Sequence, residues 1–277
     1  MGCLSRSIEG PASFPSLGPT CNPHGVFGLF SGQAANKANL VTPEAALPGR
    51  PNPIATAERH VVLGTALKAP LGTSQQEALF GCGCFWGAEK GFWRLPGVVS
   101  TAVGYAGGYT PNPSYEEVCS GRTGHTEVVR VVWDSNAIDF SDLLKLFWEC
   151  HDPTQGMGQG NDRGSQYRSS IYTDEPALLA LALASRDHYQ GQIREAGLAA
   201  ITTEIASGKP FYFAETHHQQ YLARPGARPY CSAQPSGVSL GAFAGANYKL
   251  PAALWGHYDW SISHCILRGD NSPISLT

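Results

Sequence analysis

The stretch ALFGCGCFWGAEKGFWRLPGVVSTAVGY, residues 78–105, carries the pattern on which the fold prediction depends. Residues 78–82 are a short apolar run interrupted by glycine, which predicts a buried strand. The residues from Phe85 to Arg94 predict a helix, and the segment 98–105, rich in β-branched residues, predicts a second strand. The stretch therefore predicts a strand, a glycine-rich turn, a helix and a further strand in succession.

Strands and helices remain mixed through the centre of the chain. The alternating segment 127–133 predicts a strand. Residues 140–150 predict the clearest helix, because their large apolar residues recur at the spacing of one helix face. Further predicted elements are strands at 168–172, 201–205 and 211–213, a long helix at 176–195 and a short helix at 217–222.

The elements do not alternate strictly, so a doubly wound sheet does not fit. We predict instead an α+β fold, a single two-layer sandwich with a ferredoxin-like core and helices packed on a mixed sheet. Residues 1–38 predict a disordered N-terminal tail, since they are rich in Gly, Pro, Ser and Asn. We expect the folded domain to span 39–240, with an extension at 241–277. The chain after residue 222 predicts a long coil tail that can move.

The composition excludes several classes of protein. The chain has 19 basic and 22 acidic residues, a net charge of −3 and no basic run, so we expect no nucleic-acid partner. No apolar stretch approaches the length of a membrane span. Eight cysteines in 277 residues, with no apolar leader before them, differ from a small secreted disulfide scaffold. We therefore expect reduced thiols and a cytoplasmic location.

The first three residues, Met1-Gly2-Cys3, offer alternatives to that location. Acylation of Gly2 and Cys3 would attach the chain to a membrane, but the motif requires Ser or Thr where this chain has Arg6. Organelle targeting is a further alternative, although the segment is only modestly basic. A plain tail is the default prediction.

The sharpest local feature is GCGCFWG, residues 81–87, where the predicted strand meets the predicted helix. A cysteine at a helix N-terminus ionises more easily, and the thiolate is the reactive form, so Cys84 is a candidate nucleophile. The glycines let the backbone approach a ligand closely, and Phe85 and Trp86 would supply an apolar wall. The alternative is a buried, inert cysteine, because free cysteines are among the most buried residues.

The segment 81–87 resembles the active-site signature of the class A peptide methionine sulfoxide reductases, with Cys82 where the family has methionine. Further segments that resemble the family are 40–50, 104–121, 124–129, 147–157, 159–168, 201–205 and 211–222. Agreement at so many separate blocks is specific, and it covers most of the chain between about residues 40 and 240. The resemblance implies that 39–240 is a reductase domain with its recycling tail, and leaves 241–277 unmatched.

The resemblance also implies roles for individual residues. Those that bind or activate the sulfoxide are Cys84 as nucleophile, Phe85 and Trp86 as the pocket for the substrate methyl group, Tyr115 and Tyr167 as donors to the sulfoxide oxygen, Glu127 as the acid and Asp162 as an ordering residue. The oxygen leaves sulfur only once it is protonated, so general acid catalysis is required. Burial would raise the pKa of Glu127 in the direction that this role needs.

The recycling cysteines depart from the family pattern. Cys231 matches the first recycling cysteine, but Leu240 stands near the place where many members have a second. The resemblance implies an external reductant, thioredoxin, and no bound cofactor. Either thioredoxin reduces a Cys84–Cys231 disulfide directly, which we favour, or Cys265 replaces the missing cysteine. Cys82 is a third candidate, which we expect to point away from Cys84.

The expected partners are oxidised proteins or free methionine sulfoxide of the S epimer, and thioredoxin, with a monomer as the default state. We predict no metal site, because the spacings of His151, His217 and His218 match no zinc pattern. Cys119 and Cys150 are expected to be inert thiols. Two other functions stay open: a cysteine hydrolase or acyltransferase with a histidine base, and a redox sensor that does not cycle, suggested by the altered tail.

Overall fold

A six-stranded sheet forms the centre of the computed structural model, which describes residues 38–262 and 265–276. The strands are β1 (Gln75–Cys82), β2 (Val98–Ala106), β3 (Thr126–Asp134), β6 (Ser169–Tyr172), β7 (Glu204–Ala206) and β8 (Tyr212–Phe213), in the spatial order β7-β6-β1-β3-β2-β8. The predicted tail at 1–38 and the candidate acylation site at Gly2 and Cys3 lie outside the described residues, except for Ala38.

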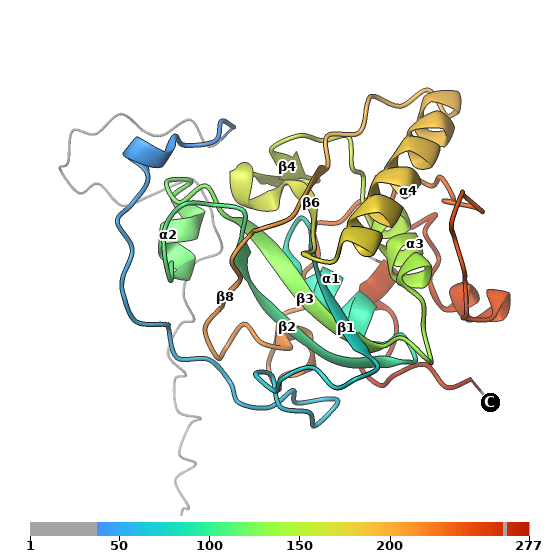
Figure 1. The fold of residues 1–277 in the computed structure, drawn as a ribbon, viewed down its shortest axis with the longest axis horizontal. Helices are drawn as coiled ribbons and strands as arrows, with labels where there is room; N and C mark the ends of the chain where they lie inside the picture. Colours follow the sequence, from blue (N-terminus) through green and yellow to red (C-terminus); the bar gives the residue numbers. More distant parts are fainter. Residues whose placement is uncertain (1–37, 263–264, 277) are drawn as a thin grey trace, which may run out of the picture. The chain divides into compact units, whose positions relative to one another are not determined.

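The topology confirms the predicted ferredoxin-like core. Strands β1, β2, β3 and β6, with helices α1 (Phe85–Trp93) and α3 (Phe140–Cys150), follow one another as βαββαβ. Neighbouring strands in the order β6-β1-β3-β2 are antiparallel, while β7 joins β6 in parallel and makes the sheet mixed. The long helix α4 (Pro176–Glu195) lies beside α3 (Figure 1), where the Trp148 indole donates to Ser185 Oγ at 2.9 Å.

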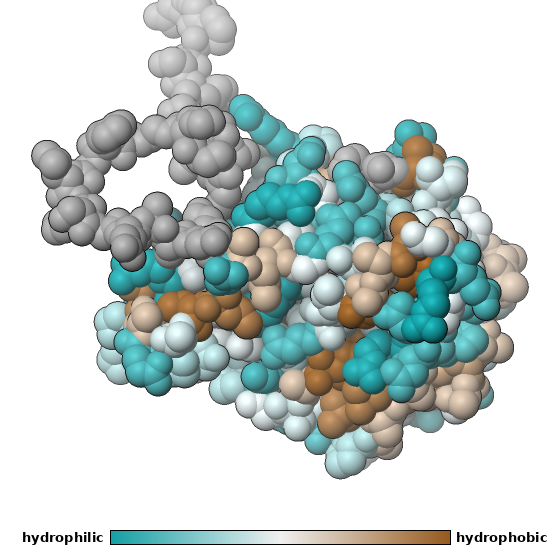
Figure 2. All heavy atoms as spheres, turned by 90° about the horizontal axis from the view of Figure 1, so that it is seen from above, coloured by the Kyte–Doolittle hydropathy of each residue, from teal (hydrophilic) through white to brown (hydrophobic). Residues whose placement is uncertain are grey.

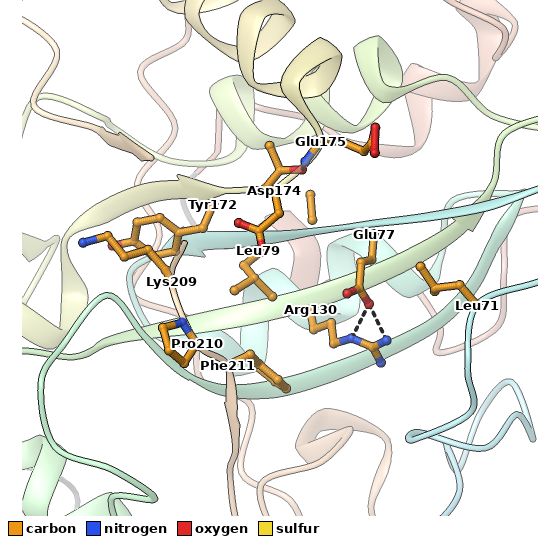
Figure 3. A pocket seen from close by; sticks show the side chains of 12 residues that line it. Leu71, Glu77, Leu79, Arg130, Tyr172, Asp174, Glu175, Lys209, Pro210 and Phe211 are labelled. Atoms are coloured by element: carbon orange, nitrogen blue, oxygen red, sulfur yellow. Dashed lines mark hydrogen bonds and ion pairs between the residues drawn. The ribbon is translucent and has the colours of Figure 1, made fainter. Parts of the chain in front are cut away.

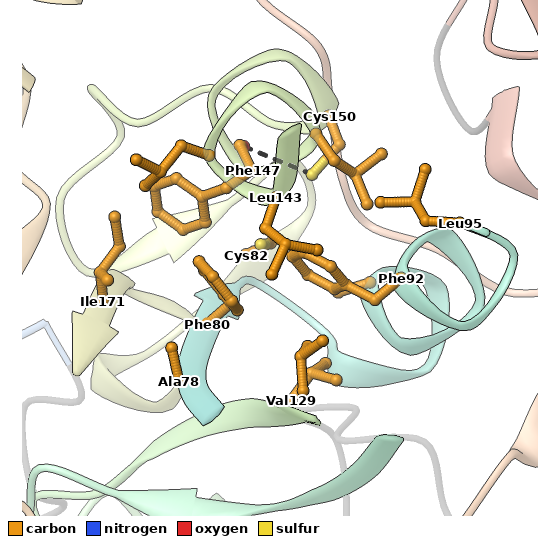
Figure 4. Close-up of a cluster of buried hydrophobic side chains, with 14 of the residues drawn as sticks. Ala78, Phe80, Cys82, Phe92, Leu95, Val129, Leu143, Phe147, Cys150 and Ile171 are labelled. Carbon is orange, nitrogen blue, oxygen red and sulfur yellow. Dashed lines mark hydrogen bonds between the residues drawn. The ribbon is translucent and has the colours of Figure 1, made fainter. Parts of the chain in front are cut away.

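The main core fills the space between the sheet and its helices (Figure 4). Phe80 on β1 stacks on Phe92 of α1, with ring centroids 4.7 Å apart, and lies 5.7 Å from Phe147 of α3. The thiols of Cys82 and Cys150 lie in the same apolar cluster, almost without exposure. Cys82 therefore belongs to the interior of the sandwich.

Two predicted elements differ in the structure. The strand expected at 201–205 is paired only at Glu204–Ala206, because Thr202 donates its amide to Pro153 outside the sheet. The helix expected at 217–222 is a 3-10 turn at Tyr221–Ala223, since Gln220 before it has a left-handed backbone.

Sequence reasoning also missed several short elements. Helix α2 (Tyr115–Cys119) begins with a capping box, in which Ser114 and Glu117 bond each other's backbone amides. The remaining short elements are the hairpin of β4 (Gly158–Gln159) and β5 (Asp162–Arg163), and 3-10 turns at Pro43–Ala45, Ser165–Tyr167, Ala252–His257 and Cys265–Leu267.

The C-terminal segment is largely coil, as predicted, but in its described part it packs tightly on α1. The Trp93 indole donates to the Asn271 carbonyl at 2.9 Å, and the Ile274 amide donates to the Arg94 carbonyl at 2.8 Å. Leu254 and Ile266 are buried in the main core. The extension beyond residue 240 therefore adds to the same hydrophobic core as the domain before it.

The surface seen in Figure 2 carries apolar residues in several separate groups, with polar residues between them. The exposed large hydrophobic side chains come from distant parts of the chain, for example Val61, Leu198 and Leu276. Within the described residues, no helix has both the length and the apolar character needed to cross a membrane.

We expect Leu254→Ala to lower the free energy of unfolding by about 2–5 kcal/mol, because it empties a buried site in the core. Leu276→Ala is the matched control: the same change at a side chain that is 57% exposed should alter stability by less than ~0.5 kcal/mol. Urea unfolding of both variants measures the difference. Equal midpoints would show that the extension does not contribute to the core.

Candidate active site

The turn between β1 and α1 places Cys84 as predicted, at the start of the helix. β1 ends at Cys82, and Gly83 has φ of +87°, a conformation that favours glycine. A Cβ at Gly83 would lie 2.6 Å from Gln159, so a larger residue has no room here. Cys84 is the N-cap residue of α1, and its amide donates to Ser232 Oγ at 3.2 Å.

The environment of the Cys84 thiol corrects one expectation. Burial raises the pKa of Cys84 well above 9.0, and the nearby Glu127 carboxylate raises it further. The Trp86 amide at the helix N-terminus acts in the opposite direction, as expected, but its effect is smaller. The prediction that the helix N-terminus makes this thiol easy to ionise is therefore wrong in the substrate-free protein, because a buried thiolate loses its hydration.

Glu127 is held directly beside the nucleophile. It lies on β3 and is 1% exposed. Its Oε2 accepts a hydrogen bond from the Phe85 amide at 3.0 Å, within the first turn of α1. The sheet and the helix thus bring the predicted acid next to the predicted nucleophile.

Aromatic side chains form one wall of the site. The Phe85 ring is buried and lies 6.0 Å from the ring of Tyr105. The Trp86 indole stacks on Tyr221, with centroids 4.0 Å apart, and donates its N–H to His218 Nδ1 at 3.2 Å. Sequence reasoning assigned Trp86 but missed His218 and Tyr221, although both lie in the segment 211–222 that resembles the family.

Tyr115 reaches this wall through His218, whose ring lies 4.4 Å away. The Tyr115 amide donates to Glu215 Oε1 at 2.9 Å. Burial lowers the pKa of His218 to about 3, so its imidazole is neutral. Because Nδ1 accepts from the Trp86 indole, the proton of the neutral ring is on Nε2, which lies 4.0 Å from Glu215 Oε2.

Asp162 and Tyr167 enter from the loop that includes β4 and β5. Asp162 Oδ1 accepts a hydrogen bond of 2.6 Å from the Tyr230 hydroxyl, next to Cys231. Tyr167 is buried in the 3-10 turn at Ser165–Tyr167. That turn is joined to β3 by the Thr126 hydroxyl, which donates to the Gln166 carbonyl at 3.0 Å.

The structure brings Cys231 to the helix of the nucleophile. Cys231 is 3% exposed, and a Cβ added at Gly87 would overlap its Sγ. Glycine at position 87 therefore provides the space in which the Cys231 thiol lies, one turn from Cys84. The neighbouring Ser232 bonds the Cys84 amide, so the two cysteine segments are joined directly.

Leu240, near which the family resemblance implied a second recycling cysteine, is fully buried. Its amide donates to Glu149 Oε1 at 2.8 Å, and Ser239 Oγ donates to the same oxygen at 2.9 Å. Cys265 begins the 3-10 turn at Cys265–Leu267, but its side chain lies outside the described set. Leu267 lines a small cavity together with Tyr230 and Cys231.

Within the described residues, Cys82, Cys150 and His151 bring their donor atoms within 4.8 Å of one another. His151 Nδ1, which lies 3.9 Å from the Cys150 Sγ, is 2.7 Å from the Phe147 carbonyl and must donate its hydrogen there. Nε2 pairs with Ser169 Oγ at 2.8 Å. Since Nδ1 has no free lone pair, this arrangement is that of a hydrogen-bonded interior and does not favour a metal ligand set.

A hollow of about 400 Å³ lies elsewhere on the sheet (Figure 3). The ion pair of Glu77 and Arg130 lies within it, and Lys209 and Phe211 border it. None of the predicted site residues lines this hollow. The predicted site residues gather instead around the start of α1.

Replacing Glu127 by Gln should move the pH midpoint of Cys84 alkylation downward. The Glu127 carboxylate raises the pKa of the thiol, so its removal lets the thiolate form at lower pH, while burial still opposes ionisation. The rate of reaction with iodoacetamide is measured by mass spectrometry in a Cys82→Ser background, from roughly pH 6 to pH 10. Glu116→Gln, at an exposed glutamate, is the control. An unchanged midpoint in Glu127→Gln would contradict the assigned cause.

Comparison with known proteins gives one family. The family model described as peptide methionine sulfoxide reductase matches residues 76–242. Peptide methionine sulfoxide reductase MsrA of Salinispora arenicola is 60% identical over 206 residues, which is 73% of this chain and 93% of the relative. The same enzyme of Ectopseudomonas mendocina is 58% identical over 207 residues, 74% of this chain and 94% of the relative.

Solved structures agree with this result. Methionine sulfoxide reductase A of Corynebacterium diphtheriae superimposes with a TM-score of 0.66 at 45% identity, covering 73% of this chain and 97% of that one. Reduced Mxr1 of Saccharomyces cerevisiae gives a TM-score of 0.54 at 31% identity, covering 59% of this chain and 92% of the yeast chain. The chain therefore belongs to the peptide methionine sulfoxide reductase family, and it is an oxidoreductase.

Proposed function

We propose that this protein reduces methionine S-sulfoxide, free or in proteins, through a sulfenic acid on Cys84 and a disulfide with Cys231 that thioredoxin reduces. The observation that carries the proposal is the arrangement around one helix end. Cys84 caps α1, the Glu127 carboxylate bonds the next amide, and the Cys231 thiol lies against the same helix at Gly87.

In the first step the Cys84 sulfur attacks the sulfoxide sulfur. The raised pKa of Cys84 means that the resting thiol still carries its proton. Glu127 accepts that proton and delivers it to the sulfoxide oxygen, while Tyr115 and Tyr167 donate hydrogen bonds to the oxygen. The oxygen passes to Cys84, so the products are a sulfenic acid and methionine. Phe85 and Trp86 hold the methyl group of the substrate.

In the second step the Cys231 thiol attacks the Cys84 sulfenic acid. A disulfide forms, and the oxygen leaves as water. An external dithiol, thioredoxin, then supplies two electrons and restores both thiols. The buried Leu240 supports direct attack on the Cys84–Cys231 disulfide, because no thiol is present at that position. Cys265 remains the alternative intermediate carrier.

A cysteine hydrolase would need a histidine base beside Cys84. The histidine of this wall, His218, is neutral with a pKa of about 3, and its Nδ1 is occupied by the Trp86 indole. His125 Nε2 pairs with the Thr110 carbonyl at 2.7 Å, and His151 pairs with Phe147 and Ser169. These contacts favour the reductase over the hydrolase.

We expect sustained reduction of an S-sulfoxide peptide, but not of the R epimer, when thioredoxin, its reductase and NADPH are supplied. Cys231→Ser should release about one equivalent of methionine per enzyme and then stop or slow greatly, because the sulfenic acid is formed but not resolved. Cys265→Ser is the comparison variant and should cycle normally. Loss of cycling in Cys265→Ser instead would make Cys265 the electron carrier. If the wild type stops after a single turnover, the result would favour the alternative function, a redox sensor that does not cycle.

Gly87→Ala should separate the two steps. The added Cβ overlaps the Cys231 Sγ, so the thiol must move away from the helix. We expect the first equivalent of methionine to form at a rate close to that of the wild type, and disulfide formation to slow by about tenfold or more, as a misplaced reacting group predicts. Rapid-quench measurement of methionine and of free thiols distinguishes the steps. Gly191→Ala, where a Cβ meets open space, is the control.

A further inference from the structure

Glu89 is a fully buried carboxyl group on α1 to which the proposed reaction gives no role. Three groups donate hydrogen bonds to it. Thr101 Oγ1 and Gln220 Nε2 donate to Oε1 at 3.0 and 2.6 Å, and the Gln220 amide donates to Oε2 at 2.8 Å. Glu89 thus joins α1 to β2 and to the residue that precedes the turn at Tyr221–Ala223.

The direction of the hydrogen bond from Thr101 follows from its other partner. His60 Nδ1 accepts the amides of Val62 and Leu63 at 3.2 and 3.1 Å, so the proton of the neutral ring is on Nε2. Nε2 donates to Thr101 Oγ1 at 2.9 Å, which leaves the threonine hydroxyl to donate its own hydrogen to Glu89. The chain of donors runs from His60 through Thr101 to the carboxylate.

Gln220 is oriented just as firmly. Its Oε1 accepts the Val61 amide at 3.2 Å, so its Nε2 is the nitrogen that faces Glu89. All three groups that bond Glu89 are therefore donors, and the ionised carboxylate is the form that satisfies them. A protonated carboxyl would lose one of these donated hydrogen bonds, because its own hydrogen would take the place of a donor's.

The backbone of Gln220 is the feature that this carboxylate holds in place. Gln220 has φ of 47° and ψ of 44°, a left-handed conformation that a residue with a side chain rarely adopts. The two residues that flank this region, His218 and Tyr221, both contact the Trp86 indole: His218 accepts its N–H, and Tyr221 stacks on its face. The conformation at 220 therefore sets the relative placement of both contacts.

We propose that Glu89 is a positioning residue for sulfoxide binding: its carboxylate holds residue 220 in the left-handed conformation and so fixes His218 and Tyr221 against Trp86. The inference rests on the proposed function, because Trp86 is there the wall for the substrate methyl group. Glu89 touches neither the substrate nor the reacting sulfur. Its effect belongs to binding and not to the chemical steps.

The charge state of Glu89 gives the inference a pH signature. Burial raises the pKa of Glu89 to about 7, against the opposing hydrogen bonds from Gln220 and Thr101 and the charge of Arg224. The other titratable group of this hydrogen-bond chain, His60, contacts Glu89 through Thr101; burial lowers the pKa of His60 to about 3, so it stays neutral. As pH falls through about 7, Glu89 becomes protonated, and the restraint on residue 220 weakens.

The first experiment compares KM and kcat of the wild type and Glu89→Gln with an S-sulfoxide peptide at about pH 8 and about pH 6. We expect Glu89→Gln to raise KM by about fivefold at the higher pH with little change in kcat, as loss of binding alone predicts. The wild-type KM should rise toward the lower pH, and that rise should be absent in Glu89→Gln. Glu116→Gln, at an exposed glutamate, should behave like the wild type. An unchanged KM and pH profile in Glu89→Gln would overturn the inference.

Two further measurements separate positioning from a general loss of folding. Glycine reaches a φ of 47° without steric cost, so Gln220→Gly should lower the KM of the Glu89→Gln variant toward the wild-type value. The ¹⁵N–¹H signal of the Trp86 indole, identified by its loss in Trp86→Phe, should titrate near pH 7 in the wild type but not in Glu89→Gln. This signal needs no turnover: a wild type that titrates but reduces no sulfoxide refutes the proposed function alone. A Trp86 indole signal that does not change with pH in the wild type refutes the role of Glu89.

Discussion

The hydrogen bond from the Phe85 amide to Glu127 is the contact on which the rest of the site depends. It joins the first turn of α1 to β3 and places a carboxylate beside the Cys84 thiol. The same contact disfavours ionisation of Cys84, because a buried negative charge raises the pKa of a neighbouring thiol. The Cys84 thiol is therefore held in the protonated form, next to the carboxylate that takes its proton in the proposed mechanism.

Helix α1 is short, but each part of it has a different neighbour. Its N-terminal residues face Glu127 and the aromatic wall, Gly87 faces Cys231, and Glu89 faces Gln220. Its C-terminal end is covered by the extension, which bonds Trp93 and Arg94. A displacement of the helix would disturb all of these contacts together, so the extension, which covers the C-terminal end of α1, supports the arrangement at the other end of the helix.

Much of this arrangement could be predicted from the sequence. The strand, turn and helix around Cys84 follow from local patterns, whereas the role of Glu127 was implied only by the family resemblance, and its place beside Cys84 depends on the pairing of β3 in the sheet. The capping box at Ser114 was also readable, since Ser and Glu three residues apart mark a helix start. The role of Glu89 was not, because its partners Thr101 and Gln220 come from distant segments and only the fold brings them together. The pKa of Cys84 was predicted wrongly for a similar reason. The helix N-terminus, which lowers it, can be predicted from the sequence, whereas the burial that raises it more strongly depends on tertiary packing.

The segment from Cys231 to Leu240 links the proposed site to the C-terminal extension. The Leu240 amide is anchored by Glu149, and the chain beyond it is packed on α1 and α3. Because the Leu240 side chain is buried in the core and its amide bonds Glu149, this part of the segment is held in place. The segment from Cys231 to Leu240 is thus fixed at both ends, at Ser232 by the Cys84 amide and at Leu240 by Glu149. In the proposed cycle, packing holds the Cys231 thiol close to Cys84, and no further cysteine lies between Cys231 and Leu240, so thioredoxin meets the Cys84–Cys231 disulfide directly.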